Sequence, residues 1–227
     1  ESLKPWYRSM CKRPLSSDDF YPAFNQPNVT LIDVSDTKGL EAMTETGFVA
    51  GGQAYDVDCL IFASGFEVSG DLDRRWGIDT VTGRDGQSLY DHWRHGPKTL
   101  HGTMTHGFPN QFFVGYIQGG LNASVTLQFG QQGYHAAQVI SQAMAKGLTS
   151  LEPSQAAQDA YLKSFHEIEI DMTAFQMECT PSYFNNEGQA NAPWSLFRSW
   201  GYGWANFEAM LKDWRDKGDL AGMITTS

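Results

Sequence analysis

The chain has 227 residues, enough to bury one large hydrophobic core or two smaller ones. Its formal net charge of -10 at pH 7 argues against nucleic acid or a membrane surface as a partner, because both present phosphate groups. Apolar runs are too short to cross a bilayer, and the first residues show neither an initiating Met nor a signal-peptide pattern.

The three cysteines bear on the cellular compartment. Cys11, Cys59 and Cys179 are odd in number, widely spaced and without a Cys-x-x-Cys pair. We therefore expect no disulfide scaffold, no zinc site and no redox dithiol, which is typical of a protein of the reducing cytoplasm.

The first elements in chain order are a loop, a strand and a hairpin. Residues 15–28 are rich in Pro, Asp, Ser and Asn and predict a loop. Residues 29–33 predict a short strand, and Gly-Phe-Val-Ala-Gly-Gly-Gln at 47–53 predicts a hairpin.

The hairpin leads into a longer predicted strand at residues 56–66. Its apolar run, residues 60–62, stops abruptly at Ala63, Ser64 and Gly65. An unbroken apolar strand is typical of a parallel sheet covered by helices on both faces. The small residues at its carboxyl end let backbone approach a ligand, which is where open α/β sheets bind cofactors.

The middle of the chain predicts loops, then a strand and a helix. Residues 67–110 are loop-rich, with turn signals at 83–86 and 107–110, and residues 111–115 predict a second buried strand. After the glycine pair at 119–120, a helix is expected to begin near Asn122 or Ser124 and to stop at Lys146-Gly147.

This strand, glycine turn and helix start form a candidate anion site. Backbone N–H groups and the positive end of the helix dipole would meet at the strand's carboxyl edge and stabilise negative charge, including that of a reduced flavin. The alternative is an ordinary strand–helix connection, since glycine pairs are common there. A P-loop is excluded, because no Lys-Ser/Thr follows the glycines.

Two more helices are predicted towards the end of the chain. One begins at Pro153 and continues to about Met177, with an apolar side at helical spacing. The other covers residues 206–217, with Gly218 as its cap.

Lys12 and Arg13 are candidate anion-binding residues. They precede Pro14, which holds the residue before it in an extended conformation, so the two cations can face two different anions. Arg forks onto delocalised anions, while Lys is a point charge suited to phosphate. The alternative is a solvated basic surface, as for most Lys-Arg pairs.

Clustered histidines do not predict a metal site. His92, His95, His101 and His106 have no spacing that completes a recognisable zinc or iron motif, and no predicted helix aligns them. We expect them to be surface loop histidines and expect no metal. The sequence also lacks a Gly-x-Ser-x-Gly elbow and a Cys–His pattern for hydrolysis.

Taken in order, these motifs resemble the carboxyl-terminal part of a Baeyer–Villiger-type flavin monooxygenase. The matching stretches are Cys-Lys-Arg-Pro at 11–14, residues 21–25, 27–29, 58–66 and 89–93, Gly-Phe-Pro-Asn at 107–110, Gly-Gly-Leu-Asn at 119–122, and residues 179–188 and 213–215. The similarity covers nearly the whole chain, and the order and spacing of the motifs make it specific.

The resemblance implies a fold class, cofactors and a reaction. It implies an α/β fold, the carboxyl-terminal portion of a flavoprotein with two Rossmann-like domains and a helical tail. Residues 1–62 would close the NADP-binding domain, residues 63–66 would form a hinge, and residues 67–227 would close the FAD-binding domain. Such enzymes use FAD and NADPH to insert one oxygen atom of O2 beside a ketone carbonyl, giving an ester or lactone.

The resemblance also implies roles for particular residues. Arg13 takes the place of the family's catalytic arginine, beside the flavin, where a permanently charged group stabilises developing negative charge. Lys12 corresponds to a residue near the 2′-phosphate of NADPH. The other implied contacts are Ala63, Ser64 and Gly65 at the cofactor hinge, Asn122, Ala123 and Ser124 at the flavin's pyrimidine edge, Gly119, Gly120 and Leu121 near the substrate, and Tyr183, Asn185 and Asn186 in a loop over NADP.

The chain departs from the family pattern in several places. Ser64 replaces the usual Thr, and Tyr116 stands where many relatives have Pro. Both dinucleotide glycine loops would lie upstream of Glu1, so we expect a fragment that alone neither holds FAD firmly nor turns over.

Two alternatives stay open at this point. The first is a flavin monooxygenase acting on nitrogen or sulfur, which shares the oxygen chemistry but not the need for Arg13. The second is a non-catalytic binding module derived from half of a flavoprotein. Gly-x-Gly-x-x-Gly loops in upstream coding sequence would argue against this second alternative.

Overall fold

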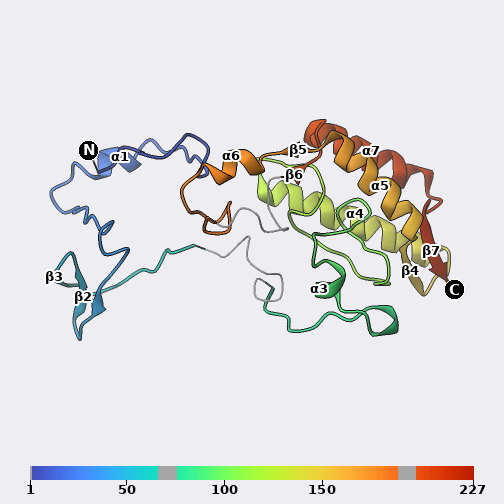
Figure 1. The fold of residues 1–227 in the computed structure, drawn as a ribbon, viewed down its shortest axis with the longest axis horizontal. Coiled ribbons are helices and arrows are strands. Elements are labelled where there is room, and N and C mark those ends of the chain that lie inside the picture. Colours follow the sequence, from blue (N-terminus) through green and yellow to red (C-terminus); the bar gives the residue numbers. More distant parts are fainter. Residues whose placement is uncertain (1, 66–75, 189–197) are drawn as a thin grey trace. The chain divides into compact units, whose positions relative to one another are not determined.

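The computed structural model describes residues 2–65, 76–188 and 198–227. The chain divides into two compact units, Glu1–Phe66 and Glu67–Ser227, and each is described here by itself. Both contain helices and strands (Figure 1), which agrees with the predicted α/β class at this coarse level. Among the described residues, every helix is too short or too polar to cross a membrane.

The first unit is built on a small antiparallel sheet with strand order β1-β2-β3. The predicted hairpin is confirmed: Phe48 pairs with Tyr55, and the turn glycines Gly51 and Gly52 have φ of 59° and 72°. Positive φ at both central residues is the geometry that a two-residue hairpin turn requires. The elements of this unit are α1 (Phe20–Ala23), β1 (Ala42–Met43), β2 (Gly47–Ala50) and β3 (Gln53–Asp56).

Two strands predicted in this unit do not form. Residues 29–33 and 57–65 lie outside every strand, because β3 ends at Asp56; Phe66 lies outside the described residues. Ile61 and Phe62 are 82% and 74% exposed. A strand exists only where a second backbone pairs with its N–H and C=O groups. The Val57 N–H donates to the Thr46 carbonyl at 2.9 Å, but residues 58–65 join no sheet in the described part of this unit.

The cysteines also differ from expectation. Cys59 is an exposed free thiol, whereas Cys11 and Cys179 are disulfide-bonded. The expectation of a chain without disulfides is therefore wrong for these two residues. The spacing of cysteines along the sequence does not determine which of them form a disulfide bond in the folded chain.

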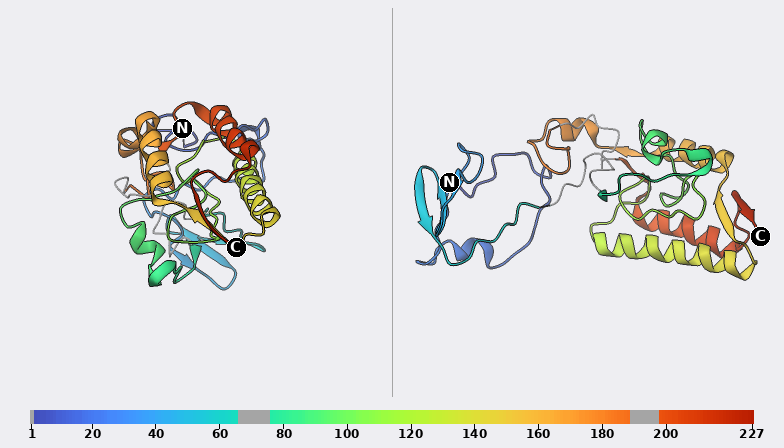
Figure 2. Two further views of the ribbon diagram at one scale, coloured as in Figure 1. Left: turned by 90° about the vertical axis from the view of Figure 1, so that its right-hand side faces the viewer. Right: turned by 90° about the horizontal axis from the view of Figure 1, so that it is seen from below.

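The second unit combines helices with two small antiparallel sheets, β4-β7 and β5-β6. The long helices α4 and α7 lie side by side, whereas α5 lies on the other side of the unit from them (Figures 1 and 2). Its elements are η1 (Arg84–Gly86), α3 (Leu89–His92), α4 (Val125–Ala145), β4 (Ser150–Pro153), α5 (Gln155–Ile168), β5 (Ile170–Asp171), α6 (Thr173–Met177), β6 (Arg198–Ser199), α7 (Gly203–Lys217) and β7 (Met223–Thr226).

Two predicted helices are confirmed. Helix α4 begins after Ser124, whose hydroxyl accepts from the Leu127 N–H at 3.4 Å, and it ends just before Gly147, which has a φ of 68°. Helix α7 ends at Gly218 with a φ of 64°, as predicted, although it begins earlier, at Gly203.

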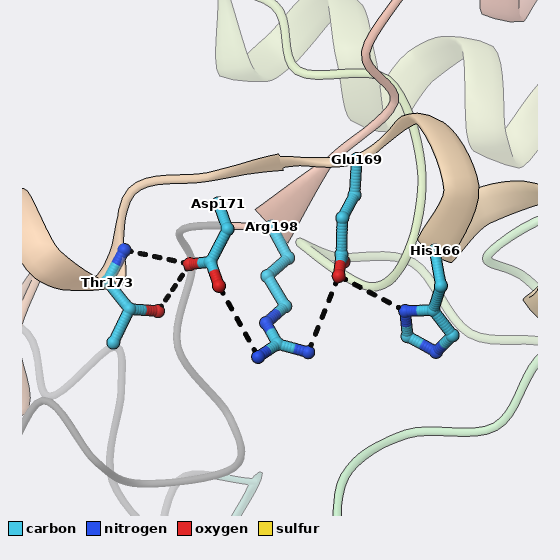
Figure 3. A network of polar contacts seen from close by, with 5 residues as sticks. All are labelled: His166, Glu169, Asp171, Thr173 and Arg198. Carbon is cyan, nitrogen blue, oxygen red and sulfur yellow. Dashed lines mark hydrogen bonds and ion pairs between the residues drawn. The ribbon is translucent and has the colours of Figure 1, made fainter.

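The single helix predicted over residues 153–177 is wrong, because the chain leaves α5 after Ile168 and pairs β5 with β6. A polar network stabilises this break (Figure 3). Arg198 bridges Glu169 at 3.6 Å and Asp171 at 3.5 Å, and His166 contacts Glu169 at 3.2 Å. Asp171 also accepts from the Thr173 N–H at 2.8 Å, at the start of α6.

The core of this unit forms two clusters. The smaller one is centred on Trp93, whose indole donates to the Thr105 hydroxyl at 3.2 Å. Residues 111–115, predicted as a buried strand, contribute Phe113 to this cluster but form no strand. Phe113 instead donates its N–H to the Thr103 carbonyl at 2.8 Å. The larger cluster contains Leu100, Met104, Val139, Ala143, Leu151, Tyr161, Phe165, Trp200, Phe207, Leu211 and Leu220.

Candidate functional site

The candidate site is built on the glycine loop, defined here as residues 115–124, which leads into α4. Gly119 and Gly120 are buried, whereas Leu121, Ala123 and Ser124 are exposed. The loop therefore reaches the surface at the N-terminus of α4. The implied flavin and substrate contacts 119–124 lie together on this one loop.

Helix α7 packs against the two glycines. A Cβ on Gly120 would lie 2.9 Å from the Phe207 Cβ, and one on Gly119 would lie 3.2 Å from the Phe207 Cζ. The Trp200 N–H also donates to the Gly119 carbonyl at 3.0 Å. Packing against Phe207 therefore excludes a larger side chain at Gly120 unless the ring moves, and it leaves a tight fit for one at Gly119.

We expect Gly120→Ala to destabilise the second unit by about 1–3 kcal/mol, because the added methyl group has to displace the buried Phe207 ring. The midpoint of urea unfolding measures this. Gly130→Ala is the matched control, since a Cβ there meets nothing within 4 Å and alanine in a helix interior should stabilise by roughly 0.5–1 kcal/mol. Equal effects of the two substitutions would contradict the packing argument.

The N-terminus of α4 suits a negative charge. Its first turn holds no acidic side chain, and the sequence of α4 contains no Asp, Glu, Lys or Arg, so nearby charges on the helix do not offset its dipole. Ser124 caps the helix, and Asn122 Oδ1 accepts from the Ser124 N–H at 2.8 Å. Ala123 and Ser124 are exposed beside this end of the helix. Small side chains next to the positive end of a helix dipole suit the polar edge of a flavin.

Five predicted site residues lie in the first unit: Lys12, Arg13, Ala63, Ser64 and Gly65. The Lys12 Nζ is 5.5 Å from the ring centroid of Tyr7, and Arg13 is exposed. Ala63, Ser64 and Gly65 are exposed as well, and Gly65 has a φ of 87°, a conformation that favours glycine. The grouping of these residues with the glycine loop into one site stays a prediction.

Asn185, implied in contact with NADP, is buried and engaged with its own segment. Its Nδ2 donates to the Thr180 carbonyl at 3.0 Å and the Gln176 carbonyl at 3.2 Å. Its Oδ1 accepts from the N–H groups of Ser182 at 2.8 Å and Gly188 at 3.0 Å. Here the side chain holds a turn together, and the implied NADP contact stays a prediction.

A buried pair of histidines lies outside what the sequence pattern predicted. His101, expected at the surface, is 5% exposed, and its ring centroid is 5.4 Å from that of His135 and 5.1 Å from that of Trp214. Burial, with smaller contributions from His135 and Arg215, lowers the pKa of His101 to about 3. Burial and then Arg215, 3.2 Å from the His135 ring, lower the pKa of His135 to about 4. Within the described residues, no three His, Cys, Asp or Glu side chains are grouped as metal ligands.

Comparison with known proteins identifies relatives along almost the whole chain. No protein-family model matches. The chain is 38% identical over 224 residues to pentalenolactone D synthase from Streptomyces exfoliatus, which covers 98% of this chain and 38% of that protein. It is 41% identical over 220 residues to a Baeyer–Villiger monooxygenase from Streptomyces coelicolor, covering 96% of this chain and 36% of that protein.

Solved structures show the same likeness. The polycyclic ketone monooxygenase from the thermophilic fungus Thermothelomyces thermophila matches with a TM-score of 0.81 and 32% identity, over 99% of this chain and 36% of that one. A structure of OTEMO in complex with FAD and NADP matches with a TM-score of 0.60 and 27% identity, over 95% and 38%. The resemblance to Baeyer–Villiger monooxygenases is thus confirmed. The chain spans 36% to 38% of the lengths of the two curated relatives above.

Proposed function

We propose that this chain is part of an FAD- and NADPH-dependent Baeyer–Villiger monooxygenase, an oxidoreductase that inserts one oxygen atom of O2 beside a ketone carbonyl to give an ester or lactone. The observation that carries the proposal is the agreement in both sequence and fold with a polycyclic ketone monooxygenase along 99% of the chain. The solved relative in complex with FAD and NADP supports the cofactor assignment.

In the proposed architecture, residues 1–62 close a Rossmann-like NADP-binding domain, residues 63–66 form the hinge, and residues 67–227 close the FAD-binding domain with its helical tail. Segment 58–65, in which Ile61 and Phe62 are exposed, supports this proposal, because a strand-like sequence that joins no sheet among the described residues of its unit is suited to join a sheet formed by the rest of a longer polypeptide. That rest of the enzyme is therefore a proposed partner.

The proposed roles follow from charge and position. Bound FAD supplies the reaction with O2, and NADPH supplies the reducing equivalents. Arg13 would stabilise, with its permanent positive charge, the negative charge that develops during oxygen transfer. The N-terminus of α4, at Asn122, Ala123 and Ser124, would stabilise negative charge on the flavin through the helix dipole. Lys12 neutralises the 2′-phosphate of NADPH. Leu121, exposed next to the buried Gly119 and Gly120, offers apolar contact to the ketone.

The test uses a polypeptide of the relatives' length that contains this chain. Loaded with FAD, it should consume NADPH and O2 and convert cyclic, linear or steroid ketones to products heavier by one oxygen atom, identified as esters or lactones by mass spectrometry. The 227-residue chain alone should bind FAD weakly and give no product. Exclusive formation of N-oxides or S-oxides from amines or sulfides would favour the rival monooxygenase class. A full-length protein that binds no FAD would favour the non-catalytic module.

A further inference from the structure

We propose that Gln128 and Gln132 are positioning residues, which hold the backbone of the glycine loop in the conformation that it presents to the flavin. The inference rests on the proposed function for the identity of the ligand. The hydrogen bonds of the two side chains to the loop backbone do not depend on that function.

The contacts of Gln132 are reciprocal. The Gly115 N–H donates to Gln132 Oε1 at 2.9 Å, and Gln132 Nε2 donates to the Gly115 carbonyl at 2.8 Å. One side-chain amide thus satisfies both backbone groups of one residue, as a neighbouring strand would. This explains how the backbone at the end of residues 111–115 is satisfied although the segment belongs to no sheet.

Gln128 holds the other end of the loop. Its Oε1 accepts from the Asn122 N–H at 3.0 Å, and the Asn122 side chain in turn accepts from Ser124, the cap of α4. Gln128 and Gln132 are both 2% exposed and lie four positions apart, so they share one face of α4. Helix α4 is therefore hydrogen-bonded to the loop at Gly115 and at Asn122, on either side of residues 119–121.

The residue type fits this role. Glutamine is uncharged and both donates and accepts, so it satisfies backbone groups from a buried position without bringing a charge into the core. An apolar side chain of similar size would leave the Gly115 N–H and carbonyl without these partners. Between Gly115 and Asn122, the loop has two more hydrogen bonds: the Tyr161 hydroxyl donates to the Gln118 carbonyl, and the Trp200 backbone N–H donates to the Gly119 carbonyl. The loop is therefore preorganised before any ligand arrives.

The test begins with Gln132→Met and Gln128→Met in the 227-residue chain, with Gln138→Met, at a partly exposed position of the same helix, as the matched control. Methionine is similar in size to glutamine but does not offer the amide oxygen that accepts from the Gly115 N–H or from the Asn122 N–H. We therefore expect amide hydrogen exchange to be about tenfold faster at Gly115 in Gln132→Met and at Asn122 in Gln128→Met, equivalent to one net hydrogen bond. The control should leave the exchange at both amides unchanged.

The second readout uses the full-length, FAD-loaded protein. We expect each of the two buried variants to weaken FAD binding about tenfold and to shift the flavin absorption spectrum, with the KM for NADPH unchanged. Unchanged amide hydrogen exchange at Gly115 and Asn122 would overturn the claim that the two glutamines hold the loop backbone. Faster exchange with an unaltered spectrum and affinity would overturn the positioning role.

A wild-type protein that binds no FAD would instead refute the proposed function, and with it the flavin part of the inference. The exchange data would still decide whether the glutamines hold the loop. If Gln132→Met does not fold, the Gln128→Met variant supplies the same comparison at Asn122, whose N–H loses its acceptor.

Discussion

Replacing Arg13 by Ala in the FAD-loaded, full-length protein should lower ester formation roughly 10²–10³-fold, the usual effect of removing one electrostatic stabiliser of developing charge. NADPH oxidation should continue, because the substitution removes stabilisation of oxygen transfer to the ketone and not the binding of the reductant. The measurement is the ratio of ester formed to NADPH consumed, which should fall steeply in the variant.

Two further variants make this result specific to Arg13. Arg13→Lys keeps a positive charge but loses the planar fork, so it should restore part of the activity. Arg8→Ala removes an exposed cation from the same basic segment and should leave ester formation near the wild-type level. If Arg13→Ala formed ester undiminished, the Baeyer–Villiger assignment would fail, and a nitrogen or sulfur monooxygenase would become the better interpretation.

Helix positions could be predicted from the sequence because their signals are local. Ser124 before α4 and Gly218 after α7 mark ends that the structure reproduces, since a cap acts on the turn next to it. The hairpin at 47–53 was predictable for the same reason, because its Gly51-Gly52 turn determines the register of the two strands.

Strands away from the hairpin were not predictable, because a strand depends on a partner that its own sequence does not name. Residues 58–65 have strand character but join no sheet in the described part of their unit. The pair β5–β6 ends the helix that residues 153–177 were predicted to form. At 111–115, a glutamine side chain takes the place of the neighbouring strand. The apolar pattern alone does not separate these cases.

The glycine loop was located from the sequence, but the side chains that hold it were missed. Their signal was present: Gln128, Gln132 and His135 share one face of α4 with the apolar residues Val139 and Ala143. Polar residues on a helix face that packs into the core must find buried partners, so they indicate contacts to backbone or to other polar groups. The apolar pattern of the helix alone does not reveal such residues.

Acid should destabilise the second unit through the histidines on and against this face. Burial lowers the pKa of His101 to about 3 and that of His135 to about 4, from 6.5. Below pH 6.5 the unfolded chain therefore binds more protons than the folded one, and the stabilisation present above that pH is lost as the pH falls through this window. Lowering the pH from about 7 to about 4.5 should cost roughly 2–3 kcal/mol per histidine, on the order of 5 kcal/mol together. Burial raises the pKa of Glu208, which opposes part of this loss at the acidic end.

Urea unfolding followed by tryptophan fluorescence over this pH range measures the loss, since Trp214 packs against both imidazole rings. His101→Gln and His135→Gln should each remove about one proton from the uptake on unfolding, and His95→Gln, at an exposed position, is the control. If the variants do not fold, imidazole NMR signals in the wild-type chain provide the same information. Two rings protonated in the folded chain at about pH 5 would refute the argument, because two more cations would then be buried in the cluster that already holds the Arg215 guanidinium.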